Sequence, residues 1–258
     1  MKGAVQLNML EFCLVYLLLF IVLFIMKKSK INQTKLLLVA SARMTVQLIL
    51  VGFILTYIME NPNPLFTLAF LLVMILFSIG LVLSKNRHIN KKFKVAVALS
   101  ITISGIFVLA FFVLAVVGEN FFNPQYTIPL AGMIIGNAMT GITLGLKTFT
   151  DNLKTGRQKI DTLLNLGVTP KKILMPYVNN ALETALLPTI NSMLGMGIIF
   201  LPGMMTGQIL SGTLPTTAIM YQIAIMIAIC TSVCLTVFCS LNFGYRTLYN
   251  NRNQIKYI

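Results

Sequence analysis

The chain has 258 residues, of which 57% are hydrophobic and only 10% are charged, and its mean hydropathy is +0.87. Soluble domains carry about 25% charged residues, so the composition excludes an ordinary soluble domain and indicates an integral membrane protein. The formal net charge of +14 would suggest nucleic-acid binding in a soluble protein. Here the basic residues follow the membrane topology, and we expect no nucleic-acid partner.

Apolar runs long enough to cross a bilayer as helices recur along the chain. They lie at 7–26, 36–58, 65–83, 95–117, 127–146, 185–210 and 218–242. The first run is followed by three lysines within four residues rather than by a small-residue cleavage site, so we interpret it as a span and not as a signal peptide. The sequence predicts an all-α, multi-pass protein of the cell membrane. It would have seven transmembrane helices in one transmembrane domain, residues 1–258, surrounded by lipid.

The basic residues alternate between the predicted loops. The first, third and fifth loops hold four, five and six lysines and arginines, the C-terminal tail holds three, and the second, fourth and sixth loops hold none. Eighteen of the twenty basic residues therefore lie on one side, which the positive-inside rule makes cytoplasmic. We predict that the N-terminus is outside and the C-terminus is in the cytoplasm.

Arg43 is an exception, because it lies inside the second predicted span. A charge within the membrane is a candidate functional residue. However, Arg43 is only about eight residues, or roughly 12 Å of helix rise, from the cytoplasmic end of the span. Its side chain could extend to that interface instead, and both interpretations stay open.

The fifth loop, residues 147–184, is the largest predicted cytoplasmic feature. Its apolar residues recur at helical spacing from Phe149 to Leu166, which predicts an amphipathic helix. Gly167 suits the position that ends a helix, Thr169 suits an N-cap, and Pro170 suits the first position of a second helix. We predict two cytoplasmic helices joined by a short glycine turn between the fifth and sixth spans. A surface helix that merely completes the bundle is the alternative.

The fifth and sixth spans have the composition of a transport path. In the fifth span, Gly132/Gly136 and Gly141/Gly145 are small-xxx-small pairs, which predict close helix packing. The glycines and prolines of the sixth run predict a helix broken around residues 201–203, and such backbone survives in a membrane only when it faces protein or water. We place the substrate path at the polar, thioether and helix-breaking residues near these features, together with Arg43: Asn137, Asn191, Ser192, Met193, Pro202, Met204, Met205 and Gln208.

The sequence assigns no metal ligands. Methionine thioethers can bind soft metals, but methionine also packs well as a flexible apolar side chain. No cluster of histidine, cysteine and carboxylate residues is visible, since the only histidine, His88, lies in a basic loop.

Four stretches resemble the FetB family of ABC-transporter permeases, which is associated with iron export and related to plant aluminium-tolerance half-transporters. They are IPLAGMIIGNAMTG (128–141), LGVTPKKI (166–173), LPTINSM (187–193) and LPGMMTGQILSG (201–212). The resemblance covers about residues 126–246, and the first four spans match only in number and hydropathy. It implies a permease subunit that exports iron or a related metal ion.

The glycine turn is also similar to the coupling loop of ABC permeases, where a short helix fits a groove on the ATPase. This similarity implies an ATPase contact at Leu163, Leu164, Leu166, Gly167, Thr169, Pro170, Ile173 and Leu174. The chain has no phosphate-binding loop of its own, because GITLGLKT (141–148) has Leu146 where the second glycine is required. We therefore expect no enzyme activity, catalytic residue or cofactor in this chain, with ATP and Mg²⁺ bound by a separate ATPase subunit. One coupling loop per chain for two nucleotide sites implies a homodimer of the permease.

Two other functions stay open. One is an ABC permease for another solute, such as a nucleotide-sugar. The other is a secondary transporter or sensor without an ATPase, which would be expected to show inverted repeats or an acidic proton relay in the membrane. No convincing repeat is visible, and Glu183 is the only acid near a cytoplasmic span end.

Overall fold

The computed structural model describes residues 9–61, 63–250 and 254, with side chains from residue 14 onward. Within these residues there is no strand beyond an isolated bridge between Met196 and Phe200, which confirms the all-α prediction. The elements are α1 (Met9–Lys28), α2 (Thr34–Glu60), α3 (Pro64–Lys85), α4 (Lys91–Phe111), the π-helical turn η1 (Phe112–Val117), α5 (Pro124–Thr155), α6 (Arg157–Asn165), α7 (Pro170–Gly195), α8 (Gly203–Leu210), α9 (Pro215–Gly244) and the 3-10 turn η2 (Tyr245–Thr247).

Five of the described helical segments are long and apolar enough to cross a membrane, so the chain is a multi-pass membrane protein. They are α2, α3, α4 with η1, α5, and α9 with η2. The first predicted span is formed as α1, a helix of 20 residues. The sixth is divided between α7 and α8. The count of seven spans and their orientation stay predictions.

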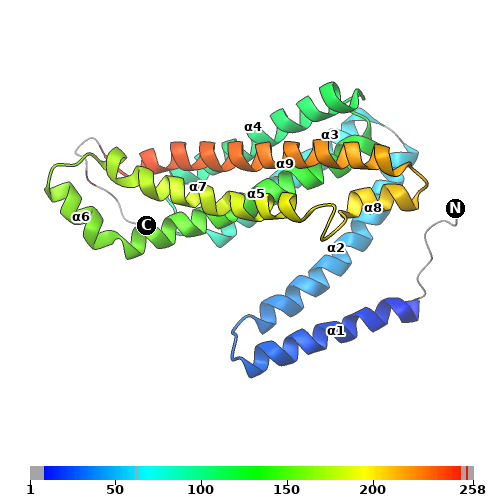
Figure 1. The fold of residues 1–258 in the computed structure, drawn as a ribbon, viewed down its shortest axis with the longest axis horizontal. Coiled ribbons are helices and arrows are strands. Elements are labelled where there is room, and N and C mark those ends of the chain that lie inside the picture. The colour runs from blue at the N-terminus through cyan, green and yellow to red at the C-terminus, as the bar shows by residue number, and fades with distance from the viewer. Residues whose placement is uncertain (1–8, 62, 251–253, 255–258) are drawn as a thin grey trace.

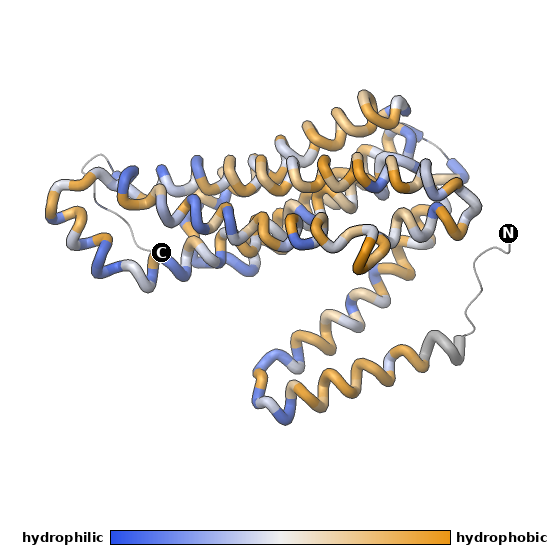
Figure 2. Tube along the Cα trace, viewed as in Figure 1, coloured by the Kyte–Doolittle hydropathy of each residue, from blue (hydrophilic) through white to orange (hydrophobic). Residues whose placement is uncertain are grey.

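The core of the bundle lies where α4, α5, α7 and α9 pack side by side, with α3 against α5 (Figure 1). Figure 2 shows hydrophobic residues along most of the helices and hydrophilic residues mainly at the helix ends and around α6. This pattern is that of a bundle whose middle is surrounded by lipid.

Close helix contacts in the core depend on the second of the two predicted glycine pairs. A Cβ at Gly141 would lie 2.6 Å from Cγ1 of Val233, and a Cβ at Gly145 would lie 3.3 Å from Cβ of Ala185. The pair therefore lets α5 approach both α9 and α7, as the sequence predicts. Gly136 differs, because a Cβ there would meet nothing within 4 Å in the described residues.

The helices α1 and α2 form a hairpin that diverges from this bundle (Figure 1). Ile58, near the end of α2, is the only residue of that helix that is buried. Since both helices are continuous, their backbone groups are paired internally, and lipid can cover their apolar side chains.

In the predicted cytoplasmic loop, residues 147–184, the helices begin and end at different residues from those that the sequence predicts. The predicted amphipathic helix from Phe149 to Leu166 is wrong, because α5 continues to Thr155 and a bend at Gly156 begins the separate helix α6. A side chain at Gly156 would collide with Tyr177 of α7, so the bend needs glycine for packing. The second cytoplasmic helix is not separate from the sixth span, since both belong to the continuous helix α7.

Candidate functional site

The turn between α6 and α7 is closed by a pattern of hydrogen bonds typical of a helix end. The N–H of Gly167 donates to the carbonyl of Leu164 (2.9 Å), and the N–H of Val168 donates to the carbonyl of Leu163 (3.0 Å). These two bonds form a Schellman motif, which requires the left-handed backbone that Gly167 adopts at φ 82°. The predicted role of Gly167 as the helix stop is confirmed.

The start of α7 also follows the sequence prediction, with one difference. Thr169 occupies the N-cap position and Pro170 the first helical turn, as predicted. The Thr169 hydroxyl makes no capping hydrogen bond, so the position is capped in backbone geometry only.

The predicted ATPase-contact residues differ widely in exposure. Leu166 projects from the turn with 74% of its surface exposed, while Leu163 and Leu164 are half-buried. Ile173 and Leu174 are buried in the core, at 4% and 0% exposed, so neither offers surface to a partner in this conformation. The accessible apolar surface of the turn is therefore centred on Leu166.

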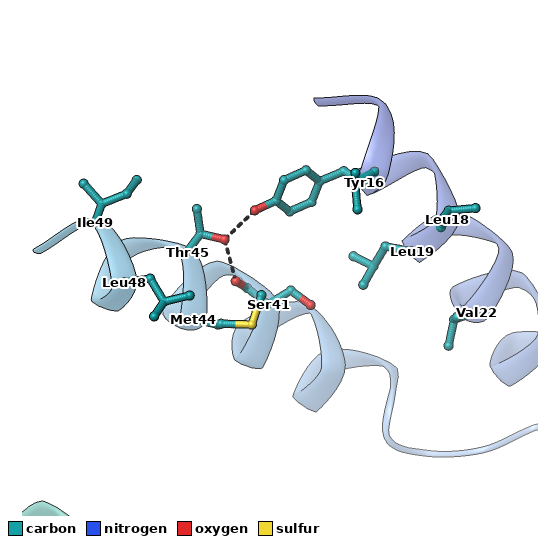
Figure 3. A pocket seen from close by; sticks show the side chains of 10 residues that line it. Tyr16, Leu18, Leu19, Val22, Ser41, Met44, Thr45, Leu48 and Ile49 are labelled. Atoms are coloured by element: carbon teal, nitrogen blue, oxygen red, sulfur yellow. Dashed lines mark hydrogen bonds between the residues drawn. The ribbon is translucent and has the colours of Figure 1, made fainter. Parts of the chain in front are cut away.

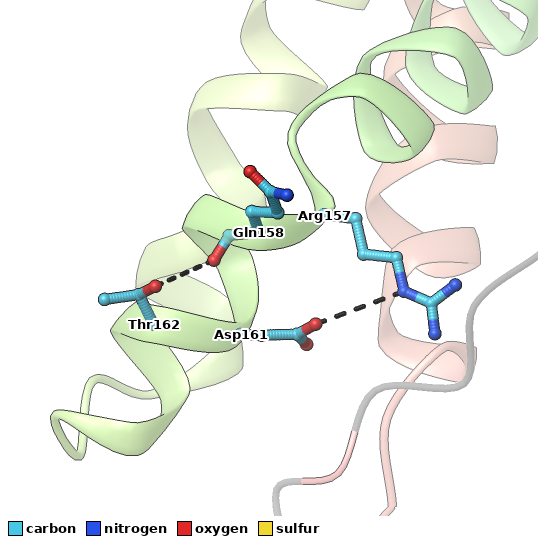
Figure 4. A network of polar contacts seen from close by, with 4 residues as sticks. All are labelled: Arg157, Gln158, Asp161 and Thr162. Atoms are coloured by element: carbon cyan, nitrogen blue, oxygen red, sulfur yellow. Dashed lines mark hydrogen bonds and ion pairs between the residues drawn. The ribbon is translucent and has the colours of Figure 1, made fainter.

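Polar side chains surround the turn. On the exposed side of α6, Nε of Arg157 lies 4.0 Å from Oδ2 of Asp161, and the hydroxyl of Thr162 donates to the carbonyl of Gln158 (Figure 4). Both partners of the ion pair are at least half exposed, so it contributes only about 0.3–0.5 kcal/mol.

A cavity of about 610 Å³ lies between the end of α5, α6 and the start of α7. The lysines Lys159 and Lys172 line it. Two other lining residues are hydrogen-bonded to each other: Nδ2 of Asn152 donates to Oδ1 of Asn180 (2.9 Å), which ties α5 to α7. The turn is thus a basic surface fixed to two membrane helices.

A second cavity, of about 260 Å³, lies where α5, α7 and α9 meet the break between α7 and α8. Among its lining residues are four that the sequence predicted for the substrate path: Asn137, Ser192, Pro202 and Met204. They come from three separate segments, and the fold brings them together. We call this space the membrane cavity.

The membrane cavity is lined by neutral groups. Its polar side chains are Asn137, Thr140, Thr189, Ser192 and Gln222, and its thioethers are Met133, Met196, Met204 and Met226. Among the described residues, no group of three or more histidine, cysteine or carboxylate side chains could hold a metal ion. The cavity therefore offers weak oxygen and sulfur donors rather than a tight site for a dehydrated transition metal.

Among the polar cavity residues that sequence reasoning missed, Gln222 is the most deeply buried. It is 5% exposed, and its Oε1 has no hydrogen-bond partner within the described part of the chain. A lone glutamine in the apolar run of α9 was the available signal, because a polar group in the membrane needs a partner or a function.

The other predicted path residues lie outside the membrane cavity. Asn191 and Met193 are exposed on α7, Met205 is buried, and Gln208 is half-buried on α8 with its Oε1 unpaired among the described residues. The guanidinium carbon of Arg43 lies 5.0 Å from the centroid of the Phe77 ring of α3. That geometry is a cation–π contact, so Arg43 has a structural partner on α3.

An apolar groove of about 610 Å³ lies between α1 and α2 (Figure 3). The hydroxyls of Tyr16 and Thr45 form a hydrogen bond across it, and the Thr45 hydroxyl also donates to the carbonyl of Ser41. The rest of its lining is almost entirely aliphatic, including Leu18, Leu19 and Leu48. A groove of this kind suits a lipid chain and carries no chemistry.

Comparisons with known proteins agree on one family. The chain is 31% identical over 242 residues to the "Probable iron export permease protein FetB" of Escherichia coli, covering 94% of this chain and 92% of the relative. It is 34% identical over 229 residues to the "UPF0014 membrane protein slr1647" of Synechocystis, covering 87% of each. It is 34% identical over 185 residues to the "Protein ALUMINUM SENSITIVE 3" of Arabidopsis thaliana, covering 72% of this chain and 67% of the relative.

No solved structure matches the chain. Residues 9–249 match the family described as "Uncharacterised protein family (UPF0014)". The match extends from α1 through α9, over both the turn between α6 and α7 and the membrane cavity. The chain therefore belongs to the UPF0014 family of membrane proteins.

Proposed function

We propose that the chain is the permease subunit of an ABC transporter and that a separate ATPase subunit binds the turn between α6 and α7. The observation that carries the proposal is the basic turn itself, with Leu166 at its exposed end. An exposed apolar side chain bordered by polar and charged groups is typical of a protein contact. The lysines around it favour an acidic partner surface.

The coupling would run through α7. This helix extends without interruption from Pro170 at the turn to Gly195 beside the membrane cavity, 26 residues or about 39 Å. A displacement of the turn by the ATPase would therefore be transmitted to the break and to the cavity wall. The hydrogen bond between Asn152 and Asn180 would carry the end of α5 along with α7.

The orientation in the membrane follows from the basic residues of the loops, which would lie on the cytoplasmic side. The turn then faces the ATPase in the cytoplasm, and seven spans place the N-terminus outside and the C-terminus inside. The ATPase would bind ATP and Mg²⁺, and two permease chains would pair with two ATPase chains, since each permease offers one turn.

We propose that iron or a related metal ion is the exported cargo. The support is the likeness to the Escherichia coli relative named as a probable iron export permease. The neutral oxygen and thioether lining of the membrane cavity suits a cargo that binds briefly and leaves, since conduction needs weak sites. The same absence of charged side chains from the cavity lining also suits a hydroxyl-rich solute such as a nucleotide-sugar, which is the second candidate.

The test is transport into sealed inside-out vesicles that contain the chain and its ATPase. ATP-dependent uptake of ferrous iron, compared with zinc, manganese and a nucleotide-sugar, identifies the cargo. An ATPase variant that binds but does not hydrolyse ATP is the control. Asn137→Ala in the cavity should lower the uptake rate several-fold with the ATPase still bound. Uptake that is independent of ATP, or the failure of any ATPase to bind the chain, would contradict the proposal.

A further inference from the structure

We infer that the open side of the break between α7 and α8, residues 194–201, is the contact surface for a second copy of this chain. In this arrangement the second copy also covers the membrane cavity. The inference deepens the proposed function by locating the surface on which two permease chains meet. The inference rests on the unpaired backbone groups of the break and does not depend on the identity of the cargo.

The break leaves many backbone groups without partners. Within the described residues, the N–H groups of Ile198 and Leu201 make no hydrogen bond, and neither do the first three N–H groups of α8. Of the carbonyls from Met196 to Leu201, only that of Phe200 accepts a hydrogen bond, from the N–H of Gly197 at 3.0 Å. Such a segment needs water or protein around it.

The break lies below the outer ends of the neighbouring helices. It borders the membrane cavity beside Asn137 and Gln222. Asn137 is 13 residues into α5 and Gln222 is 7 residues into α9, which correspond to about 20 Å and about 10 Å of helix rise from the outer ends. Both helices, of 32 and 30 residues, are longer than the hydrocarbon layer of about 30 Å, so the break lies between the outer edge of this layer and its middle. Lipid cannot pair with the free backbone groups there, and their exposure to lipid would cost more than a folded protein can absorb.

Nothing in the described chain covers the open side of the break. Ile198 is 92% exposed, Ile199 81% and Leu194 76%. The ATPase cannot reach this depth, because it lies in the cytoplasm. A wall of protein inside the membrane must come from another membrane protein, and a second copy of the permease is the partner that the two-ATPase assembly already requires.

The neighbouring face of α5 supports the same surface. Gly136 has open space around it, and Thr140 lies one turn further along with its side chain exposed. A small residue such as Gly136, with no neighbour within 4 Å in the described chain, allows another helix to approach closely. Asn137, between them, exposes an amide at mid-membrane, which is unfavourable against lipid and acceptable against protein or enclosed water.

The α1–α2 hairpin is another exposed apolar surface, and it lacks this requirement. Its helices pair their own backbone groups, so lipid is a sufficient environment for them. The break is therefore the surface that demands a partner. In a symmetric pair the same residues from both copies meet near the two-fold axis, so residues of the break should lie near their own counterparts.

Cysteine cross-linking in native membranes tests the inference. The four cysteines, Cys13, Cys230, Cys234 and Cys239, are first replaced by alanine. Single cysteines are then introduced by Ile198→Cys and Ile199→Cys, which are exposed positions that do not disturb the core. Ile103→Cys on α4 and Leu50→Cys on α2 are matched controls, because both are exposed and lie near the middle of their helices.

With an oxidant or a short bifunctional thiol reagent, we expect a dimer band from Ile198→Cys or Ile199→Cys that is at least ten times stronger than from the controls. A band from Leu50→Cys alone would place the contact on the hairpin and overturn the inference. Equal bands at all positions, or none at the break, would overturn it as well. The result is independent of transport: cross-linking without ATP-dependent uptake would contradict the proposed function, and uptake without cross-linking at the break would contradict only this contact surface.

Discussion

Replacement of Gly167 by valine should separate ATPase binding from folding of the membrane bundle. The residue has φ 82°, and, apart from its chain neighbours, no atom of the described residues lies within 4 Å of the position where a Cβ would be. The cost of a side chain is therefore backbone strain and not a collision. A left-handed backbone costs an ordinary residue about 1–2 kcal/mol, and a β-branched residue tolerates it least.

A strain of about 2 kcal/mol lowers the population of the native turn relative to a rearranged one by up to roughly thirtyfold. Rearrangement would break the hydrogen bonds from Gly167 and Val168 and redirect the start of α7. Apparent affinity for the ATPase should fall by up to the same factor, because only the native turn binds. The thermal stability of the bundle should change little, since the turn is at one end of it.

The assay is titration of the purified permease with its ATPase, alongside a thermal unfolding curve. Gly167→Asn is the matched control, because asparagine adopts left-handed backbone more readily than other residues with a side chain. We expect affinity to decrease in the order Gly, Asn, Ala, Val. If the valine and asparagine variants bind the ATPase equally well, the geometry of the turn is not what the ATPase recognises and the reasoning is refuted.

Three further predictions follow from the structure. Leu166→Asp should weaken ATPase binding at least tenfold in a pull-down titration without lowering the melting temperature, because its side chain is exposed in the free chain; unchanged binding would remove Leu166 from the contact. Gly141→Ala should destabilise the bundle by about 1–3 kcal/mol, because the added methyl group overpacks against the buried side chain of Val233. Adding Val233→Ala should partly restore the stability. A double variant as unstable as the sum of the two single variants would contradict this close contact. Cysteines introduced at Asn63 and Asn86, on either side of α3, should react with an impermeant thiol reagent from opposite sides of the membrane, and labelling from the same side would contradict the topology.

Local features of the sequence were sufficient to predict the class of protein and two details of its structure. Hydropathy alone indicates membrane helices, because a bilayer imposes length and apolarity on each span. The Gly167, Thr169 and Pro170 series predicted the stop of α6 and the start of α7, since helix ends depend on a few adjacent residues. Pro202, with its flanking glycines, predicted the break in the sixth run for the same reason.

Only the tertiary structure decided which helix faces meet. Ile173 and Leu174 resemble Leu166 in the sequence pattern, but contact with the rest of the bundle buries them and leaves Leu166 outside. In the sequence, Gly156 cannot be distinguished from the other residues of a polar loop. In the structure, Tyr177, from a helix later in the chain, occupies the space beside it.

The membrane cavity depends on the same kind of long-range contact. Asn137 and Ser192 line it while Asn191 does not, because neighbouring positions on one helix point in different directions. Gln222 completes the cavity from α9, some 85 residues after Asn137 in the sequence. Sequence spacing fixes which residues share a face of one helix, whereas the neighbour that each face meets depends on how the whole bundle packs.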